Sequence, residues 1–129
     1  MNKIVISGYY GFANAGDEAM LTSIVRALRG VQPEIDLTVI SGNPTETSAK
    51  HKVKSIYRFN FFKIYSAVKN ADMLLSGGGS LLQDVTSLRS LFYYLFIILI
   101  GKMAGKKVML YSHGIGPIRN TLARKLTRI

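Results

Sequence analysis

The sequence predicts an α/β fold in which helices cover both faces of a doubly wound, parallel sheet. Short apolar segments, too brief for helices, alternate with longer amphipathic segments along the chain. Glycine-rich turns follow three of these short segments, as is usual where a buried strand leads into a helix. Such alternation favours a parallel sheet with right-handed crossovers. With 129 residues, of which 48% are hydrophobic, the chain can bury the core of one domain.

The N-terminal segment predicts a strand over residues 3–7, a glycine-spaced loop over residues 8–16 and a helix that ends near Gly30. Asp17 or an immediate neighbour is expected to cap this helix. The loop glycines do not have the GxGxxG spacing of dinucleotide sites, and neither GxxxxGKS nor GxxxxGKT occurs in the chain. The sequence therefore supports neither NAD nor ATP, and we expect no cofactor.

The middle of the chain predicts two further strands and one helix. A strand over residues 37–40 ends in a loop that is polar to about Lys50. Residues 53–56 predict a short third strand, and residues 61–69 predict a helix. That helix is expected to turn three side chains inward, those of Phe62, Tyr65 and Val68.

The second half of the chain continues the alternation. An apolar strand over residues 72–75 precedes a triple-glycine segment. Residues 88–104 predict a long apolar helix that Gly105 ends, and residues 108–111 predict a fifth strand. A basic amphipathic helix is expected from Arg119 onward. Internal repeats and low-complexity tracts are absent from the sequence.

The most apolar run, residues 91–100, is far shorter than the roughly 20 residues that a helix needs to cross a bilayer, so we expect a buried helix. The N-terminus lacks the apolar core and cleavage pattern of a signal peptide, and we expect a cytoplasmic protein. Cysteine is absent, which excludes disulfides and Cys-based metal sites. His51 and His113 are too few for a zinc site built on histidine alone, and no metal is expected.

The positive charge lies in the second half of the chain. Residues 1–50 hold four Lys or Arg and five Asp or Glu, a net charge of −1, whereas residues 51–129 hold thirteen and two, a net charge of +11. We expect this half to meet anions, such as a phosphorylated substrate, the phosphates of a lipid-linked one, or an acidic membrane surface. No nucleic acid is expected, because the basic residues are not interleaved with aromatic ones in a recognised binding motif.

The segment from Ser76 to Asp84, SGGGSLLQD, is the strongest candidate for a binding site. Its three glycines permit positive φ and close approach of backbone N–H groups to a ligand, and the following helix start adds unpaired N–H groups. In a Rossmann-like order the strands before Gly8 and Gly77 are neighbours at the switch point, outside which ligands bind. A tight turn whose glycines only permit close packing remains the alternative.

Three blocks in the sequence resemble the polysaccharide pyruvyltransferases: GYYGFANAGDE at residues 8–18, SGGGSLLQDVTS at residues 76–87 and HGIGP at residues 113–117. The resemblance is closest to the bacterial branch that modifies the cell-wall polysaccharide to which surface-layer proteins are anchored. It implies transfer of a pyruvyl group from phosphoenolpyruvate to two hydroxyls of a sugar, often N-acetylmannosamine. The product would be a cyclic ketal, with loss of phosphate.

The resemblance also implies a GT-B-like fold with a Rossmann-like domain on each side of a cleft. Residues 1–129 are then expected to be the N-terminal domain, with the C-terminal domain absent and the fragment inactive by itself. Whether the glycan acceptor is lipid-linked stays open, and peripheral contact with an anionic membrane is expected. A GT-B-like glycosyltransferase that uses a nucleotide sugar, and a non-enzymatic module that binds a glycan or a phosphate, are the alternatives.

Two residues are candidates for catalysis of the pyruvyl transfer. Asp17 could take a proton from an acceptor hydroxyl, although a helix cap explains it equally well. His113 could protonate the methylene carbon of the donor, or instead bond to backbone in its loop. The candidates for substrate binding are Gly8, Gly11, Asn14, Gly16, Ser76, Gly77, Gly78, Gly79, Ser80, Gln83, Asp84, Gly114 and Gly116.

Several of these candidates have structural alternatives. Asn14 could be a turn residue that tolerates positive φ, and Asp84 could complement a helix dipole in its first turn. Tyr9, Tyr10 and Phe12 could stack on a sugar ring, but packing over their own loop is the preferred interpretation.

Overall fold

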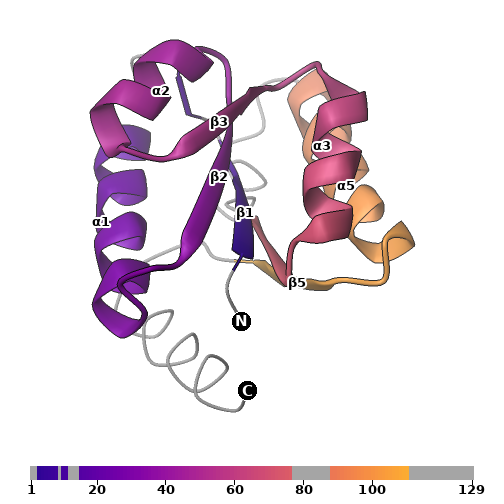
Figure 1. Cartoon of the computed structure of the whole chain (residues 1–129). Coiled ribbons are helices and arrows are strands. Elements are labelled where there is room, and N and C mark those ends of the chain that lie inside the picture. Colours follow the sequence, from indigo (N-terminus) through magenta and orange to yellow (C-terminus); the bar gives the residue numbers. More distant parts are fainter. Residues whose placement is uncertain (1–2, 9, 12–14, 77–87, 111–129) are drawn as a thin grey trace.

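The computed structural model describes residues 3–8, 10–11, 15–76 and 88–110. They form a five-stranded, all-parallel sheet in the order β3-β2-β1-β4-β5, with helices on both faces (Figure 1). The elements are β1 (Lys3–Ser7), α1 (Ala15–Val31), β2 (Asp36–Ser41), α2 (Pro44–His51), β3 (Lys54–Tyr57), α3 (Phe61–Asn70), β4 (Met73–Ser76), α5 (Leu88–Met103) and β5 (Lys107–Leu110). The predicted Rossmann-like, doubly wound α/β class is confirmed.

Strand β1 lies at the centre of the sheet and pairs with β2 on one side and β4 on the other. Its last residue, Ser7, is in register with Ile40 of β2 and with Ser76 of β4. The expectation that the strands before Gly8 and Gly77 are neighbours is therefore confirmed. Ligands of such sheets bind outside the carboxyl ends of the strands at this position.

The three central strands, β2, β1 and β4, have buried side chains on both faces of the sheet. Successive side chains of a strand point to opposite faces. Ile4 and Ile6 of β1 pack with α1, whereas Val5 packs with α3 and α5. Figure 1 shows the same division, with α1 and α2 on one side of the sheet and α3 and α5 on the other. The two faces of the sheet thus have separate cores.

Helix α2 is a difference from the sequence prediction, which placed a polar loop up to Lys50. Asn43 caps this helix: its Oδ1 accepts from the Glu46 N–H at 3.3 Å, and its Nδ2 donates to Glu46 Oε2 at 3.1 Å. Pro44 occupies the first turn, where its missing N–H costs nothing. Local capping therefore overrides the low helix propensity of a polar segment with two threonines.

The inward face predicted for α3 is wrong for two of its three residues. Ile64 and Val68 are buried, whereas Phe62 is 88% exposed and Tyr65 is 42% exposed. Residues four apart lie on one helix face, so burial of Ile64 and Val68 turns Phe62 and Tyr65 outward.

The burial predicted for the apolar run of α5 is also only partly right. Ile97 and Ile100 are buried against the sheet, but Phe92, Phe96 and Leu99 are exposed to solvent. No helix within the described residues is long and apolar enough to cross a membrane. Helix α5 is therefore apolar on two sides, of which the sheet covers only one.

Candidate functional site

The loop after β1 is packed directly on the connection between β2 and α2. Gly11 has φ 82°, and a Cβ atom there would lie 2.2 Å from Ser41 Oγ and 2.5 Å from the Asn43 backbone nitrogen. The Gly42 N–H donates to the Tyr10 carbonyl at 2.9 Å. Only glycine meets both requirements at position 11, the left-handed backbone and the absence of a side chain.

Tyr10 is buried beneath this loop, with 2% of its surface exposed. Its ring lies so close to Gly8 that a Cβ atom on Gly8 would come within 2.6 Å of it. The preferred interpretation of Tyr10, packing against its own loop, is confirmed. Tyr9 and Phe12 lie outside the described residues.

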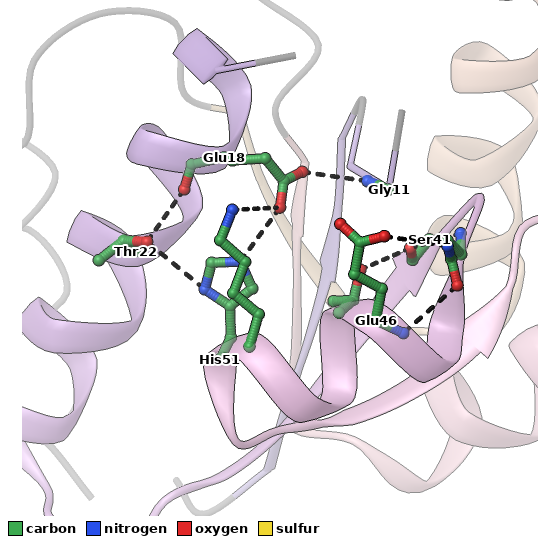
Figure 2. Close-up of polar contacts among 9 residues, drawn as sticks. Gly11, Glu18, Thr22, Ser41, Glu46 and His51 are labelled. Carbon is green, nitrogen blue, oxygen red and sulfur yellow. Dashed lines mark hydrogen bonds and ion pairs between the residues drawn. The ribbon is translucent and has the colours of Figure 1, made fainter. Parts of the chain in front are cut away.

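A buried carboxylate fixes the same loop from the other side (Figure 2). Glu18 of α1 accepts the Gly11 N–H at Oε2 over 3.0 Å, and its Oε1 lies 3.2 Å from His51 Nε2 of α2. Because an ionised carboxylate only accepts, the Nε2 of His51 carries a hydrogen. The Nζ of Lys50 lies farther away, at 3.9 Å from Oε1. Glu18 thus joins the loop, α1 and α2 at one point.

The other nitrogen of His51 faces Thr22, one helical turn after Glu18. Its Nδ1 is 3.5 Å from Thr22 Oγ1, and the Thr22 hydroxyl donates to the Glu18 carbonyl at 3.0 Å. The Glu18 and His51 side chains are both buried, at 9% and 3% exposure. A buried charge is tolerated only when it is paired and hydrogen-bonded, and Glu18 meets this condition.

The hydroxyl at the end of β2 is also fully bonded. Ser41 Oγ lies 2.7 Å from Thr47 Oγ1 and accepts the Asn43 N–H at 2.9 Å. Ser41 and Thr47 are each 1% exposed. These bonds hold the start of α2 against the end of its strand, where Gly11 also packs.

The ends of β1 and β4 are different. Ser7 and Ser76 are register partners on adjacent strands, and both are 0% exposed. Among the residues that the structure describes, neither hydroxyl has a hydrogen-bond partner. Buried hydroxyls are nearly always bonded, so two neighbouring exceptions need an explanation. Both lie at the switch point of the sheet, the place where Rossmann-like folds bind ligands.

Ser7 was missed by the sequence prediction, which selected Ser76 but not this register partner. A signal was present: β1, β2 and β4 all end in an aliphatic residue followed by Ser-Gly, at Ser7, Ser41 and Ser76. Glu18 and His51 were also missed as a pair, because 33 positions separate them and only the packing of α1 on α2 brings them together.

Gly16 and Asp17 both lie in the first turn of α1, which begins at Ala15. The cap expected at Asp17 is therefore wrong, because the helix starts two residues before it. The other predicted site residues lie outside the described part of the chain; they are Asn14, Gly77, Gly78, Gly79, Ser80, Gln83, Asp84, His113, Gly114 and Gly116. Within the described part, no three His, Cys, Asp or Glu side chains are grouped as a metal ion would require.

The sequence model of one protein family, described as polysaccharide pyruvyl transferase, matches residues 14–129. The chain belongs to the polysaccharide pyruvyl transferase family. No curated protein and no solved structure matches it. The match confirms the family resemblance. It includes the second and third blocks and residues 14–18 of the first, and every described helix and strand except β1.

Proposed function

We propose that the protein transfers the pyruvyl group of phosphoenolpyruvate to two hydroxyls of one sugar unit in a cell-wall polysaccharide. The acceptor sugar would be N-acetylmannosamine, in a glycan that anchors surface-layer proteins. Membership of the family supports pyruvyl transfer to a polysaccharide. The observation that supports a small anionic donor is the pair of hydroxyls of Ser7 and Ser76 at the switch point, for which the described residues supply no hydrogen-bond partner.

The proposed reaction needs both a base and an acid. Protonation of the methylene carbon of the donor makes its central carbon electrophilic, and a first sugar hydroxyl adds there and loses its proton. Phosphate then leaves with the C–O bond electrons, and the second hydroxyl adds and loses its proton. The two protons released by the hydroxyls equal the two gained, one by the new methyl group and one by phosphate.

Asp17 and His113 are the proposed groups for these proton transfers, as the family resemblance implied. The backbone of Asp17 lies in the first turn of α1, close in sequence to the fixed Gly11 loop. A carboxylate there suits removal of a hydroxyl proton, and His113 suits delivery of a proton to carbon. Ser7 and Ser76 would donate to oxygens of the phosphate or carboxylate, whose negative charge strengthens such hydrogen bonds.

Glu18 and His51 have a different role in this proposal. Their atoms are bonded to each other, to Gly11 and to Thr22, so neither is placed to exchange a proton with substrate. They position the loop that precedes Asp17. Catalytic groups act well only when such surrounding bonds hold their geometry.

The test is an assay of the full-length protein, including the expected C-terminal domain, with phosphoenolpyruvate and an acceptor glycan that contains N-acetylmannosamine. We expect one phosphate released for each acid-labile pyruvate ketal formed, without any nucleotide. An acceptor with one of the two hydroxyls methylated is the control, and it should give no ketal. Consumption of a nucleotide sugar in place of phosphoenolpyruvate would overturn the proposal in favour of a glycosyltransferase.

A further inference from the structure

Helices α3 and α5 expose a continuous apolar surface on the side that faces away from the sheet. Its six main members are 38% to 88% exposed, and we call this set the apolar face. They are Phe61, Phe62, Phe92, Leu95, Phe96 and Leu99. Single exposed apolar residues are ordinary, but a contiguous group of large ones marks an interaction surface.

The apolar face belongs to one packed unit. The rings of Phe61 and Phe96 meet edge-on at 5.2 Å and join α3 to α5, which lie together on one side of the sheet in Figure 1. Between these helices an open groove of about 620 Å³ is lined by five members of the face together with Tyr93. The face is therefore a defined surface and not a set of isolated side chains.

The base of the face is held by Arg58 and Tyr93. The Arg58 guanidinium lies 4.6 Å from the centre of the Tyr93 ring and 4.7 Å from that of Phe59. The Tyr93 hydroxyl donates to the Arg58 carbonyl at 2.6 Å. Burial raises the pKa of Tyr93 to about 12, although Arg58 opposes this, so its hydroxyl is uncharged at neutral pH.

The charge around the apolar face has one sign. Helices α3 and α5 contain no Asp or Glu, and their exposed lysines are Lys63, Lys69 and Lys102. Lys69 lines a second groove together with Phe61 and Phe62. In the described residues from 51 onward, Asp72 is the only acidic side chain. A surface of aromatic and aliphatic side chains flanked by lysine is complementary to an anionic bilayer, whose headgroups attract the lysines while the rings enter the interface.

A second copy of the chain fits this surface less well. A symmetric dimer through the apolar face would bring the lysines of two chains together, each chain with a net charge of +10. Like charges placed face to face cost several kcal/mol. No acidic residue on α3 or α5 is present to pair with them.

We propose that the apolar face of α3 and α5 is a docking surface for an anionic phospholipid bilayer. Phe62, the most exposed member, enters the interface, and Lys63 and Lys69 contact the headgroups. The chain then lies on the membrane surface without crossing it. This inference does not depend on the reaction proposed above.

The absence of tryptophan allows a direct test. Phe62→Trp places a single fluorescent reporter on the apolar face, and Arg26→Trp places the matched control on α1, on the opposite side of the sheet. The 129-residue chain is mixed with vesicles of phosphatidylglycerol and phosphatidylcholine. We expect a blue shift, and quenching by brominated lipid, for Trp at position 62 only. Vesicles of phosphatidylcholine alone should give much weaker binding.

Two further variants separate the contribution of charge to vesicle binding from that of apolar contact. Lys63→Gln should weaken vesicle binding about fivefold, since one basic residue near an anionic surface contributes about 1 kcal/mol. Phe62→Ser should weaken it roughly tenfold or more, by loss of the buried ring. Arg26→Gln should change it little. All three side chains are exposed, so the thermal unfolding transition should stay in place.

Three results would overturn the proposal. One is equal binding to vesicles with and without phosphatidylglycerol, and a second is vesicle binding that Phe62→Ser leaves unchanged. The third is a dimer in light scattering that Phe62→Ser dissociates, in the absence of any vesicle binding. That last result would assign the apolar face to a second copy of the chain.

Discussion

At the carboxyl edge of the sheet, strands β1, β2 and β4 all end in Ser-Gly, but their serine hydroxyls differ in hydrogen bonding. At the end of β2, Ser41 is bonded on two sides, and the nearby Gly11 loop is tied to Glu18. At the ends of β1 and β4, the hydroxyls of Ser7 and Ser76 have no hydrogen-bond partner within the described part of the chain. The first region is a scaffold whose polar groups are satisfied within the protein. The second keeps two hydroxyls without an internal partner at the position where a ligand would bind.

The largest effect on the scaffold should come from breaking the pair of Glu18 and His51. We expect His51→Ala to lower the free energy of unfolding by about 3 kcal/mol, because it leaves the Glu18 carboxylate buried without its main partner. Glu18→Gln should cost less, since its amide oxygen can still accept the Gly11 N–H. Urea unfolding measures both. A loss for His51→Ala no greater than that for an exposed alanine substitution would show that the pair does not support the scaffold.

Gly11→Ala should cause the second-largest loss of stability. The left-handed backbone and the approach of Ser41 and Asn43 leave no room for a methyl group, so we expect a loss of about 2 kcal/mol. Gly30→Ala is the matched control. Gly30 lies in α1 with open space around its Cα, and alanine there should stabilise the helix by about 0.5 to 1 kcal/mol. Equal signs for the two substitutions would contradict the close packing of the loop.

Ser41→Ala tests the bonded serine itself. It removes the contact with Thr47 and leaves the Asn43 N–H without its acceptor, so we expect a loss of about 1 to 1.5 kcal/mol. The measurement is again the free energy of unfolding in urea. No loss would mean that water replaces these bonds and that the end of β2 is less rigid than its contacts indicate.

We expect the smallest effect on stability from Ser7→Ala and Ser76→Ala. These two substitutions test most directly whether Ser7 and Ser76 differ from the bonded Ser41. Removal of an unpartnered buried hydroxyl should leave the free energy of unfolding unchanged or raise it slightly. In the intact protein the same substitutions should lower transfer from phosphoenolpyruvate about tenfold or more, because a hydrogen bond to a charged group contributes about 1.5 to 3 kcal/mol.

Two outcomes would contradict one part of that prediction, either the unchanged stability or the lowered transfer. A loss of stability equal to that of Ser41→Ala would remove the contrast between the two regions. Unchanged stability together with unchanged transfer would keep the contrast but exclude a role of these hydroxyls in donor binding.

Much of the fold could be predicted from local pattern. The five strands are within one residue of their predicted bounds. β1, β2 and β4 are short apolar runs that a Ser-Gly step ends, which makes their bounds easy to predict. Helix α2 was missed because its polar residues show little apolar periodicity. The start of this helix does carry three sequence signals: an N-cap at Asn43, a first-turn proline at Pro44 and an acidic residue at Glu46. These signals would have predicted the helix.

The site was less predictable, for a physical reason. The motifs that resemble the family are local, so Gly11 and Ser76 were found as candidates, but contacts between distant segments leave no trace in spacing. The pairing of Glu18 with His51 depends on how α1 and α2 pack, and the pairing of Ser7 with Ser76 depends on strand order. The outward turn of Phe62 likewise reflects where α3 meets the sheet and not its own composition.

The central position of β1 has a consequence for how the protein is made. Strand β1 is synthesised before β4 but needs it to complete its pairing, and the bond from the Lys3 N–H to Asp72 Oδ2 spans 69 positions. At a synthesis rate of about 5 to 20 residues per second, one edge of an apolar strand stays unpaired for several seconds. Closing so long a loop also costs entropy before any contact repays it, which slows folding. The nascent chain therefore passes through a period in which the central strand of its sheet is open to pairing with other chains.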